Sequence, residues 1–382
     1  LSQEQFFVGP HQPNNRLWPI PLGANDSRIP DILADASVAV SYTGSDMLLL
    51  NAANTGHFIT LYDDELRGRI MREILAGTLE SSVRAQYLNE QLLLMRGGLL
   101  PSSTLVDLLS VYKNESDQKV WEIISLALSE LKKFVDRDTA AEHMLRTFAA
   151  DLARMQYTRL GWSMAQGEPE QDTKLRAIVI GCMLYGEDVD AIRQARELYH
   201  ANTLEQLDAE LRPLIIGAVV RNDQQPHNIV RTLLQAYEDS TSAELRSDIA
   251  SGVTATRDYS ELKHLTRLLT NTRVIRSQDT IHWFVDLLRN REGRELAWKW
   301  LRDNWKWIEK TFASDKSHDY FPRYAASLLM TRQQLAEYRE FFTPLRNDQS
   351  LVRAIDMGLL DLEGKLDLID RDAPGVIAAL SR

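Results

Sequence analysis

From residue 63 to the end of the chain, apolar side chains recur with the spacing of an α-helix, and this periodicity constrains the fold most strongly. The segment 117–135, DQKVWEIISLALSELKKFV, is a clear case. Its apolar stripe is formed by Val120, Ile123, Ile124, Ala127, Leu128 and Leu131. Acidic residues open the segment 63–77 and a glycine closes it, as helix termini prefer.

The same pattern repeats along the chain with short polar links between the segments. The predicted helices are 63–77, 84–98, 101–114, 117–135, 138–159, 173–185, 188–200, 203–221, 226–238, 242–255, 258–269, 277–290, 293–312, 317–329, 332–345 and 347–360. Roughly 320 residues of helix exceed what one core buries, because single cores stop growing at about 250–300 residues. No strict repeat motif is visible. The sequence therefore predicts a mainly α fold, with an irregular HEAT- or armadillo-like α-superhelix over 64–382.

The first 63 residues carry strand signals instead. Segment 36–44 alternates apolar and polar residues, and segment 47–63 has the pattern of two strands around a turn at 54–56. Two prolines in 16–24 make that segment an edge or irregular strand. We predict a small β-sandwich-like module over 1–63, preceding the superhelix, and expect it to be incomplete because a small isolated sheet buries little.

Charge and cysteine content exclude several classes of function. The formal net charge is -10, with 54 acidic and 44 basic residues, which argues against a general nucleic-acid binder. The single cysteine, Cys182, lies in an apolar run and allows no intrachain disulfide, so a cytoplasmic location is the expectation. The first residues do not resemble a signal peptide, and no segment approaches the roughly 20 apolar residues of a membrane span. We therefore expect neither nucleic acid nor membrane as a partner.

The histidines do not have the spacing of a metallopeptidase. They are His11, His57, His143, His200, His227, His264, His282 and His318, and none has a second histidine within five residues. The motif H-E-x-x-H, which places two imidazoles on one helical face, is therefore missing. Glu261 and His264, at i and i+3, are the nearest approach to a metal pair, and we interpret them as an ion pair on a helix face. Phosphate-loop and nucleophile-elbow motifs are also missing, so we assign no catalytic, cofactor-binding or metal residue.

Four tryptophans in the segment 295–310 form its most unusual composition. Trp298 and Trp305 share one helical face, and Trp300 and Trp307 share an adjacent one. We favour an aromatic core seam between helices. The alternative is a binding surface for a peptide or a partner domain. The neighbouring charged residues at 291–294 and 301–304 are interpreted as a solvated face.

Five segments form an ordered series over residues 1–312. They are LSQEQFF with LWPIPL (17–22); LLLNAANTGHFITLYD (48–63), with Asn51, Gly56, Phe58, Tyr62 and Asp63; 84–121, with Glu115, Asp117 and Trp121; LGW (160–162) with KLR (174–176); and IRSQDT (275–280), with Trp283 and NREGRELAWKWLRDNW (290–305). Together they resemble the C-terminal half of the aminopeptidase N family, which includes the puromycin-sensitive and endoplasmic-reticulum aminopeptidases. Ile59 departs from the family, which usually has arginine there.

The resemblance implies a zinc-dependent parent aminopeptidase that removes N-terminal amino acids from peptides. Its catalytic domain and zinc ligands would lie upstream, so this chain alone is expected to be inactive and to hold no cofactor. Residues 1–63 would be the small β-sandwich, and 64–382 would be the helical domain that covers the catalytic cleft, limits access and helps hold the peptide. The expected partners are the upstream catalytic domain of the same polypeptide and peptide substrates.

Two other functions remain open from the residues alone. A stand-alone helical-repeat scaffold for protein interactions has the same composition, although the strands of 1–63 favour a module that bridges to something upstream. An α-helical enzyme with an acidic site has only scattered carboxylates in its favour.

Overall fold

A computed structural model describes residues 1–8, 16–42, 47–312, 314 and 317–382. The chain divides into two compact units, and each is described by itself below. Unit 1 comprises residues 1–179 and 368–382, and unit 2 comprises residues 180–367. Two helices, α6 (Glu170–Tyr185) and α17 (Gln349–Leu380), contribute residues to both units. None of the helices in the described part of the chain combines the length and the apolar character of a membrane span.

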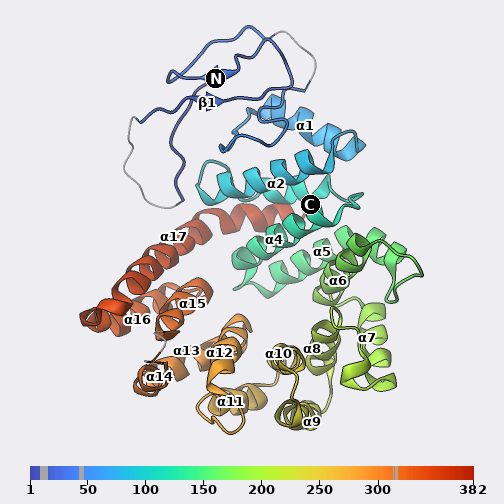
Figure 1. Ribbon diagram of the computed structural model, residues 1–382, viewed down its shortest axis with the longest axis vertical. Coiled ribbons are helices and arrows are strands. Elements are labelled where there is room, and N and C mark those ends of the chain that lie inside the picture. Colours follow the sequence, from blue (N-terminus) through green and yellow to red (C-terminus); the bar gives the residue numbers. More distant parts are fainter. Residues whose placement is uncertain (9–15, 43–46, 313, 315–316) are drawn as a thin grey trace. The chain divides into compact units, whose positions relative to one another are not determined.

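Unit 1 is built from helices (Figure 1), several of which begin at an aspartate cap. Besides parts of α6 and α17, it contains α1 (Asp64–Ala76), α2 (Ser81–Arg96), α3 (Thr104–Ser110), α4 (Gln118–Val135) and α5 (Thr139–Leu160). Asp63 caps α1, because its Oδ1 accepts a hydrogen bond from the Leu66 N–H at 2.9 Å. Gly77 ends the same helix in the left-handed conformation, at φ 70°.

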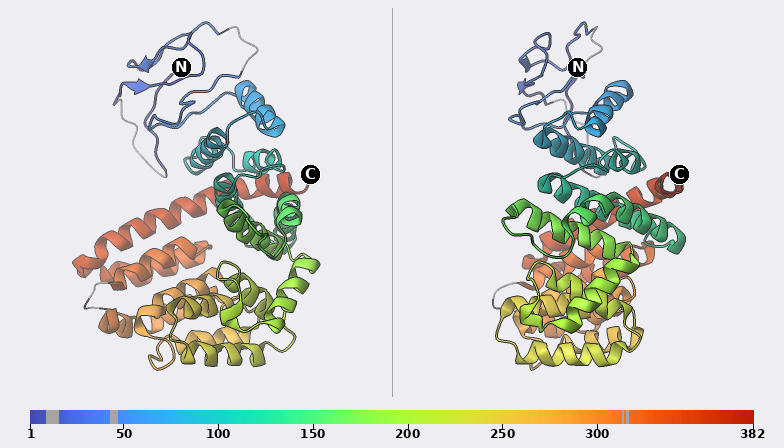
Figure 2. Two further views of the ribbon diagram at one scale, coloured as in Figure 1. Left: turned by 45° about the vertical axis from the view of Figure 1, so that its right-hand side comes forward. Right: turned by 90° about the vertical axis from the view of Figure 1, so that its right-hand side faces the viewer.

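The N-terminal 63 residues contain less strand than the sequence predicted. In the described part of this segment, β1 (Ile20–Pro21) pairs antiparallel with β2 (Ile32–Leu33), and one isolated bridge joins Ser2 to Ser37. Figure 2 shows this segment (blue) as mostly extended coil. The predicted hairpin over 47–63 is not formed as strands, and 43–46 lie outside the described residues.

Side-chain amides hold this segment where strand ladders were expected. The Gln3 side-chain Nε2 donates to the carbonyls of Trp18 and Asp35 at 2.9 and 3.0 Å, and Gln3 Oε1 accepts from the Trp18 N–H. Asn25 bonds in the same way to the Met47 carbonyl and the Leu49 N–H. A small apolar cluster forms the core: Leu22, Ile29, Leu33 and Leu48. With so little apolar surface to bury, side-chain hydrogen bonds stabilise the backbone locally.

Unit 2 is a stack of helices in two layers (Figure 1). Its helices are α7 (Val189–Ala201), α8 (Arg212–Asn222), α9 (Pro226–Asp239), α10 (Ala243–Val253), α11 (Tyr259–Leu268), α12 (Thr280–Arg289), α13 (Arg294–Asp303), α14 (Trp305–Phe312), α15 (Tyr320–Leu328) and α16 (Arg332–Phe342), with parts of α6 and α17. Helices α8, α10, α12 and α15 pack side by side in one layer, and α9, α11 and α13 pack against one another and against it. This is the packing of stacked helical hairpins, and the predicted mainly α fold is confirmed.

Close approach of α8 and α10 depends on a glycine. A Cβ at Gly252 would overlap the side chain of Ile216 and would lie 3.4 Å from the Gly217 backbone nitrogen. Only glycine therefore lets these two helices pack so closely.

Helix boundaries differ most from the prediction in three places. The predicted helix 203–221 is a short 3₁₀ turn, Leu204–Gln206, followed by α8. The predicted helix 293–312 breaks at Asn304, whose side chain donates to the Trp300 carbonyl at 2.8 Å, so that α13 and α14 are separate. Helix α17 continues to Leu380, well beyond the predicted end at 360, although it contains Pro374.

Tertiary contacts explain the length of α17. The Ser102 N–H donates to Asp372 Oδ2 at 2.9 Å, and the Ser102 hydroxyl donates to the same oxygen. Arg371 pairs with the other oxygen, Oδ1, at 2.6 Å. Helix propensity alone would disfavour the proline, but this buried contact within unit 1 holds the end of α17.

Candidate functional site

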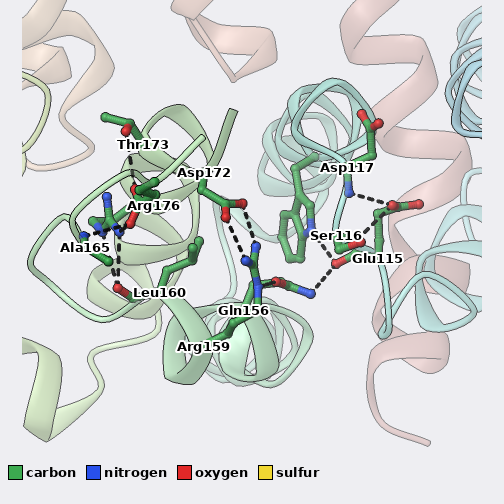
Figure 3. Close-up of polar contacts among 12 residues, drawn as sticks. Glu115, Ser116, Asp117, Gln156, Arg159, Leu160, Ala165, Asp172, Thr173 and Arg176 are labelled. Atoms are coloured by element: carbon green, nitrogen blue, oxygen red, sulfur yellow. Dashed lines mark hydrogen bonds and ion pairs between the residues drawn. The ribbon is translucent and has the colours of Figure 1, made fainter. Parts of the chain in front are cut away.

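Several residues that carry the family resemblance lie in unit 1 and form its internal hydrogen bonds, and Glu115 is the clearest case (Figure 3). Its side chain is 2% exposed, and its two oxygens bond to Arg84 Nε and Nη2 at 2.7 and 2.8 Å. One of these oxygens also accepts from the N–H groups of Ser116 and Asp117, both at 2.8 Å. The carboxylate is therefore fully used in holding the turn before α4.

A network of hydrogen bonds begins at the Glu115 backbone carbonyl and links α4, α5 and α6 (Figure 3). That carbonyl accepts from Trp121 Nε1 at 2.9 Å and from Gln156 Nε2 at 2.8 Å. Gln156 Oε1 accepts from Arg159, which forms a bidentate pair with Asp172 at 2.8 and 2.9 Å. The hydrogen bond from Arg159 lowers the pKa of Asp172. Each member has a partner, so the network stabilises the fold and leaves no group directed at a ligand.

The LGW and KLR segments serve the loop between α5 and α6. Arg176, buried at 3% exposure, donates to the Leu160 carbonyl and pairs with Glu168. Glu168 also accepts from the Ala165 N–H at 3.1 Å. This loop is thus fixed by one buried guanidinium (Figure 3).

The segment 48–63 is held by its own polar side chains. Asn51 adopts φ 54°, and its side chain brackets Gly56 with two hydrogen bonds, at 2.7 and 2.9 Å. The Leu50 N–H donates to the Tyr62 hydroxyl at 2.9 Å, and burial raises the pKa of Tyr62 to about 12. Buried Glu90 accepts from the Thr60 N–H at 3.1 Å. These residues shape the backbone and offer no reactive group.

The tryptophan cluster is the predicted core seam. Trp298 is fully buried, and Trp300 and Trp305 are each 6% exposed. Trp298 stacks on Tyr338 with ring centroids 6.2 Å apart, and Trp305 meets Phe342 edge-on at 5.5 Å. The interpretation as a core seam is confirmed for these three tryptophans, while Trp307 is half-buried and packs edge-on against Trp300 and Phe312.

The described residues form no metal-binding site. They bring together no group of three or more His, Cys, Asp or Glu side chains that could hold a metal ion. Glu261 is 5% exposed and pairs with Nδ1 of His227 on α9 at 2.8 Å, so the predicted surface ion pair of Glu261 with His264 is wrong. His11 lies outside the described residues. The described residues therefore do not fit the zinc ion that the resemblance implies for the parent enzyme.

The candidate site is a hollow of about 520 Å³ on the layer formed by α10, α12 and α15 in unit 2. Residues from three helices and a 3₁₀ turn line it: Ser251, Gln278, Ile281, His282, Val285, Asp286, Arg289, Tyr320 and Tyr324. Three side-by-side helices thus contribute polar and apolar groups to one surface. Polar side chains placed beside apolar ones are the groups that fix the orientation of a bound ligand.

Asp286 is the centre of the polar part of this hollow. It is 9% exposed, and its Oδ1 accepts from Arg289 Nη1 at 3.0 Å. Its Oδ2 lies 2.9 Å from the Ser251 hydroxyl and 3.1 Å from His282 Nε2. The hydrogen bond to Asp286 raises the pKa of His282 above its usual value, although burial opposes the shift.

The geometry of this cluster is not that of a catalytic triad. In a triad, one imidazole nitrogen faces the serine and the other faces the carboxylate. Here the Ser251 hydroxyl lies 3.1 Å from His282 Nε2, the same nitrogen that faces Asp286. The ring therefore does not stand between hydroxyl and carboxylate, and the arrangement suits binding rather than nucleophilic attack.

The rim of the hollow is accessible. The side chains of His282 and Arg289 are 44% and 66% exposed, and Tyr320 and Tyr324 are 43% and 37% exposed. The two tyrosine rings stack with centroids 6.1 Å apart. Cationic donors beside two exposed aromatic rings can bind an extended peptide that carries an acidic group.

Sequence reasoning did not identify this hollow. One signal was present, because His282, Asp286 and Arg289 are spaced by four and three residues on the predicted helix 277–290. Ser251 and the two tyrosines come from other helices, and their approach depends on packing.

Stacked helices define this chain as a mainly α-helical protein. It belongs to the family described as "ERAP1-like C-terminal domain", whose model matches residues 47–363. The resemblance to the C-terminal region of aminopeptidase N is thereby confirmed.

Relatives of the chain carry aminopeptidase names. It is 31% identical to Aminopeptidase N of Lactococcus lactis subsp. lactis (strain IL1403), over 97% of this chain and 44% of the relative. It is also 31% identical to Aminopeptidase N of Lactobacillus delbrueckii subsp. lactis, over 100% of this chain and 46% of the relative. Aminopeptidase M1-B of Oryza sativa subsp. japonica is 27% identical over 81% of this chain and 36% of the relative. The chain spans less than half the length of these relatives, and their N-terminal parts are not covered.

Proposed function

We propose that this chain is the non-catalytic C-terminal part of a zinc aminopeptidase that removes N-terminal amino acids from peptides. The observation that carries the proposal is its similarity over nearly its whole length to aminopeptidases about twice as long. In this proposal the uncovered N-terminal part supplies the zinc ligands and the chemistry. The domain boundary predicted at residues 63 and 64 belongs to the same proposal, and α1 beginning at Asp64 supports it.

The helical domain covers the catalytic cleft, limits access to it and helps hold the peptide. A stack of helices suits this role because one of its layers offers a long surface without a rigid pocket. The hollow lined by His282, Arg289, Tyr320 and Tyr324 is the proposed contact for the part of the peptide distant from the bond that is cleaved. The cytoplasm remains the proposed location, on the evidence of a single, buried cysteine, Cys182.

An activity assay on this chain tests the division of labour. Residues 1–382 are purified, supplied with stoichiometric zinc and incubated with a chromogenic amino-acid anilide. We expect no release of the chromophore above a buffer blank. Sustained turnover that is abolished by a zinc chelator would show that the chain has its own catalytic centre and would refute the proposal.

A binding assay tests the hollow separately. We expect Arg289→Gln to weaken the binding of a short peptide about tenfold by calorimetry, because a charge-assisted hydrogen bond is lost. The matched control is Arg267→Gln, an exposed arginine on α11 that does not line the hollow. Equal affinities of the two variants would remove the hollow from the proposal while leaving the family assignment intact.

The stand-alone scaffold is the second candidate. The accessible tyrosine pair Tyr320 and Tyr324 would suit a protein partner as well as a peptide. One experiment separates the two candidates. This chain is combined with the N-terminal catalytic part, and the peptide lengths that the enzyme prefers are measured. A part of an aminopeptidase should change that preference, and a stand-alone scaffold should not.

A further inference from the structure

The imidazole of His282 is the group of the hollow whose charge changes near neutral pH. Hydrogen bonds link its protonation to the other polar residues there. His282 lies 3.1 Å from both Asp286 Oδ2 and the Ser251 hydroxyl, and its ring also hydrogen-bonds to the Ser247 backbone carbonyl. An imidazolium ring has two N–H donors, whereas the neutral ring has one. Only the charged ring can therefore give a separate N–H donor to Asp286 and to Ser247.

We propose that the protonation of His282 controls how strongly the hollow binds an acidic group of a peptide, with Arg289 as the group that meets it. The proposal rests on the proposed peptide-holding role and adds its regulation. With His282 charged, Asp286 is shared among His282, Ser251 and Arg289. Arg289, whose side chain is 66% exposed, then has N–H donors to offer to a ligand.

Loss of the proton changes these bonds in a defined way. The neutral ring keeps one N–H, and when it is directed at the Ser247 carbonyl, Nε2 becomes an acceptor. The Ser251 hydroxyl has a single hydrogen and lies within reach of both His282 Nε2 and Asp286. It turns toward the ring, and Asp286 then retains Arg289 as its remaining charged donor. The buried carboxylate holds the guanidinium more tightly and competes with the ligand for it.

The other groups around His282 do not replace its charge. Helix α15 contributes Tyr320 and Tyr324 to the hollow, and the 3₁₀ turn before α12 contributes Gln278. On α10, Asp248 is paired with Arg212 at 2.8 Å. Arg323 of α15 lies over the Tyr320 ring, 5.8 Å from its centroid.

Among the other packed elements, Asp279 of the 3₁₀ turn accepts from the Tyr237 hydroxyl at 2.9 Å. Helices α11 and α13 also pack on α12, and none of their described residues lines the hollow. The charged lining therefore has one net positive charge when His282 is protonated and none when it is neutral.

The test measures peptide affinity below and above the titration of His282. An N-acetylated peptide with a free C-terminal carboxylate is titrated into the full chain at about pH 6 and about pH 9, where its carboxylate stays ionised throughout. We expect affinity to be about two- to fivefold higher at the lower pH, the range for one added exposed charge contact. His282→Asn should abolish this difference, and His264→Asn, an exposed histidine outside the hollow, should preserve it.

Two further arms identify the acidic group. One arm uses the same peptide as its C-terminal amide, and the other uses that amide with one internal glutamate. Comparing them distinguishes recognition of a terminal carboxylate from recognition of a side-chain carboxylate. The pH difference should follow whichever peptide carries the recognised carboxylate. Amides without any carboxylate should show no pH difference.

A second measurement reports on His282 without a ligand. The imidazole resonances of His282 in the NMR spectrum should titrate with a pKa above the usual 6.5, and Asp286→Asn should lower that pKa. Binding that is equally tight at both pH values, or a His282→Asn variant that keeps the difference, overturns this inference alone. If no peptide binds at either pH, the peptide-holding role fails, and this inference fails with it.

Discussion

Two carboxylates show how differently the two units use the same chemistry. In unit 1, Glu115 is 2% exposed and is bonded to Arg84, itself 16% exposed, and to two backbone N–H groups. In unit 2, Asp286 is 9% exposed, but its partner Arg289 is 66% exposed. All hydrogen bonds of the Glu115 carboxylate are therefore made within the fold. The pair of Asp286 and Arg289 leaves a cation at the surface, and this is what a binding site requires.

The comparison also explains why the family-like residues of unit 1 did not point to the hollow, which lies in unit 2. The Trp121 side chain bonds to the Glu115 carbonyl before α4, and Arg176 holds the loop between α5 and α6, so these residues stabilise the fold. A resemblance that rests on such residues identifies the architecture. Function has to be argued from a site whose groups face solvent.

The largest expected effect concerns Glu115. Glu115→Gln removes the charge that pairs with Arg84 and leaves a nearly buried guanidinium without its counter-ion, so we expect a loss of about 3 kcal/mol in unfolding free energy. Urea denaturation followed by circular dichroism measures it. Glu122→Gln, an exposed position on the next helix, is the control. Similar losses in the two variants would contradict the structural role given to Glu115.

The second prediction concerns Asp372, which links the end of α17 to Ser102. Burial alone would raise the pKa of Asp372, but hydrogen bonds from Arg371 and Ser102 outweigh it and lower the pKa below 3.8. The ionised form therefore stabilises the fold above that pH, and its contribution disappears as the pH falls through the lowered pKa.

Asp372→Asn should accordingly cost about 2 kcal/mol at neutral pH. The difference from the unmodified chain should shrink in acid, as measured by urea denaturation at a series of pH values. Asp361→Asn, an exposed position on the same helix, should show neither effect. A cost that stays constant from neutral to acid pH would mean that the charge of Asp372 is irrelevant.

The third prediction compares two helix starts in unit 1. Asp63 accepts a hydrogen bond from the Leu66 N–H, whereas Glu80, at the start of α2, makes no such side-chain bond. Asp63→Ala should therefore cost about 1 kcal/mol, and Glu80→Ala should cost much less. Thermal denaturation distinguishes them, and a larger loss for Glu80→Ala would argue against the capping described here.

The smallest effect is expected at the hollow. Arg289→Gln should change unfolding free energy by less than about 0.5 kcal/mol, because the side chain is exposed. The matched variant Arg176→Gln, at a position 3% exposed, should be clearly destabilising in the same urea experiment. If Arg289→Gln were as costly as Arg176→Gln, the hollow would be another structural link and the comparison between the units would fail.

Much of the fold was predictable because helix formation reports on local spacing. Segments such as 117–135 and 226–238 match α4 and α9 within a residue or two, since an apolar stripe and a capping residue suffice to define them. The break at Asn304 was not visible, because the apolar residues on either side continue the same period. The extension of α17 past 360 was missed as well, since glycines and a proline argue against a helix there. Tertiary contacts, such as buried Leu366 and the bond between Ser102 and Asp372, sustain it.

In the N-terminal segment, by contrast, the local sequence pattern did not predict the structure. Strand-like alternation around 36–62 was real in the sequence, but strands need partners. The structure instead places side chains such as Gln3 and Asn51 on the backbone groups that a ladder would have occupied.

By itself, the sequence determined that the chain is mainly α, where most of its helices begin and end, and which family it resembles. These depend on residues close together in the chain, whose periodicity and capping act within a few turns. Only the tertiary structure brought Ser251, Asp286 and Tyr324 to one surface. They lie on α10, α12 and α15, and their meeting depends on how the helices pack, which no local pattern encodes.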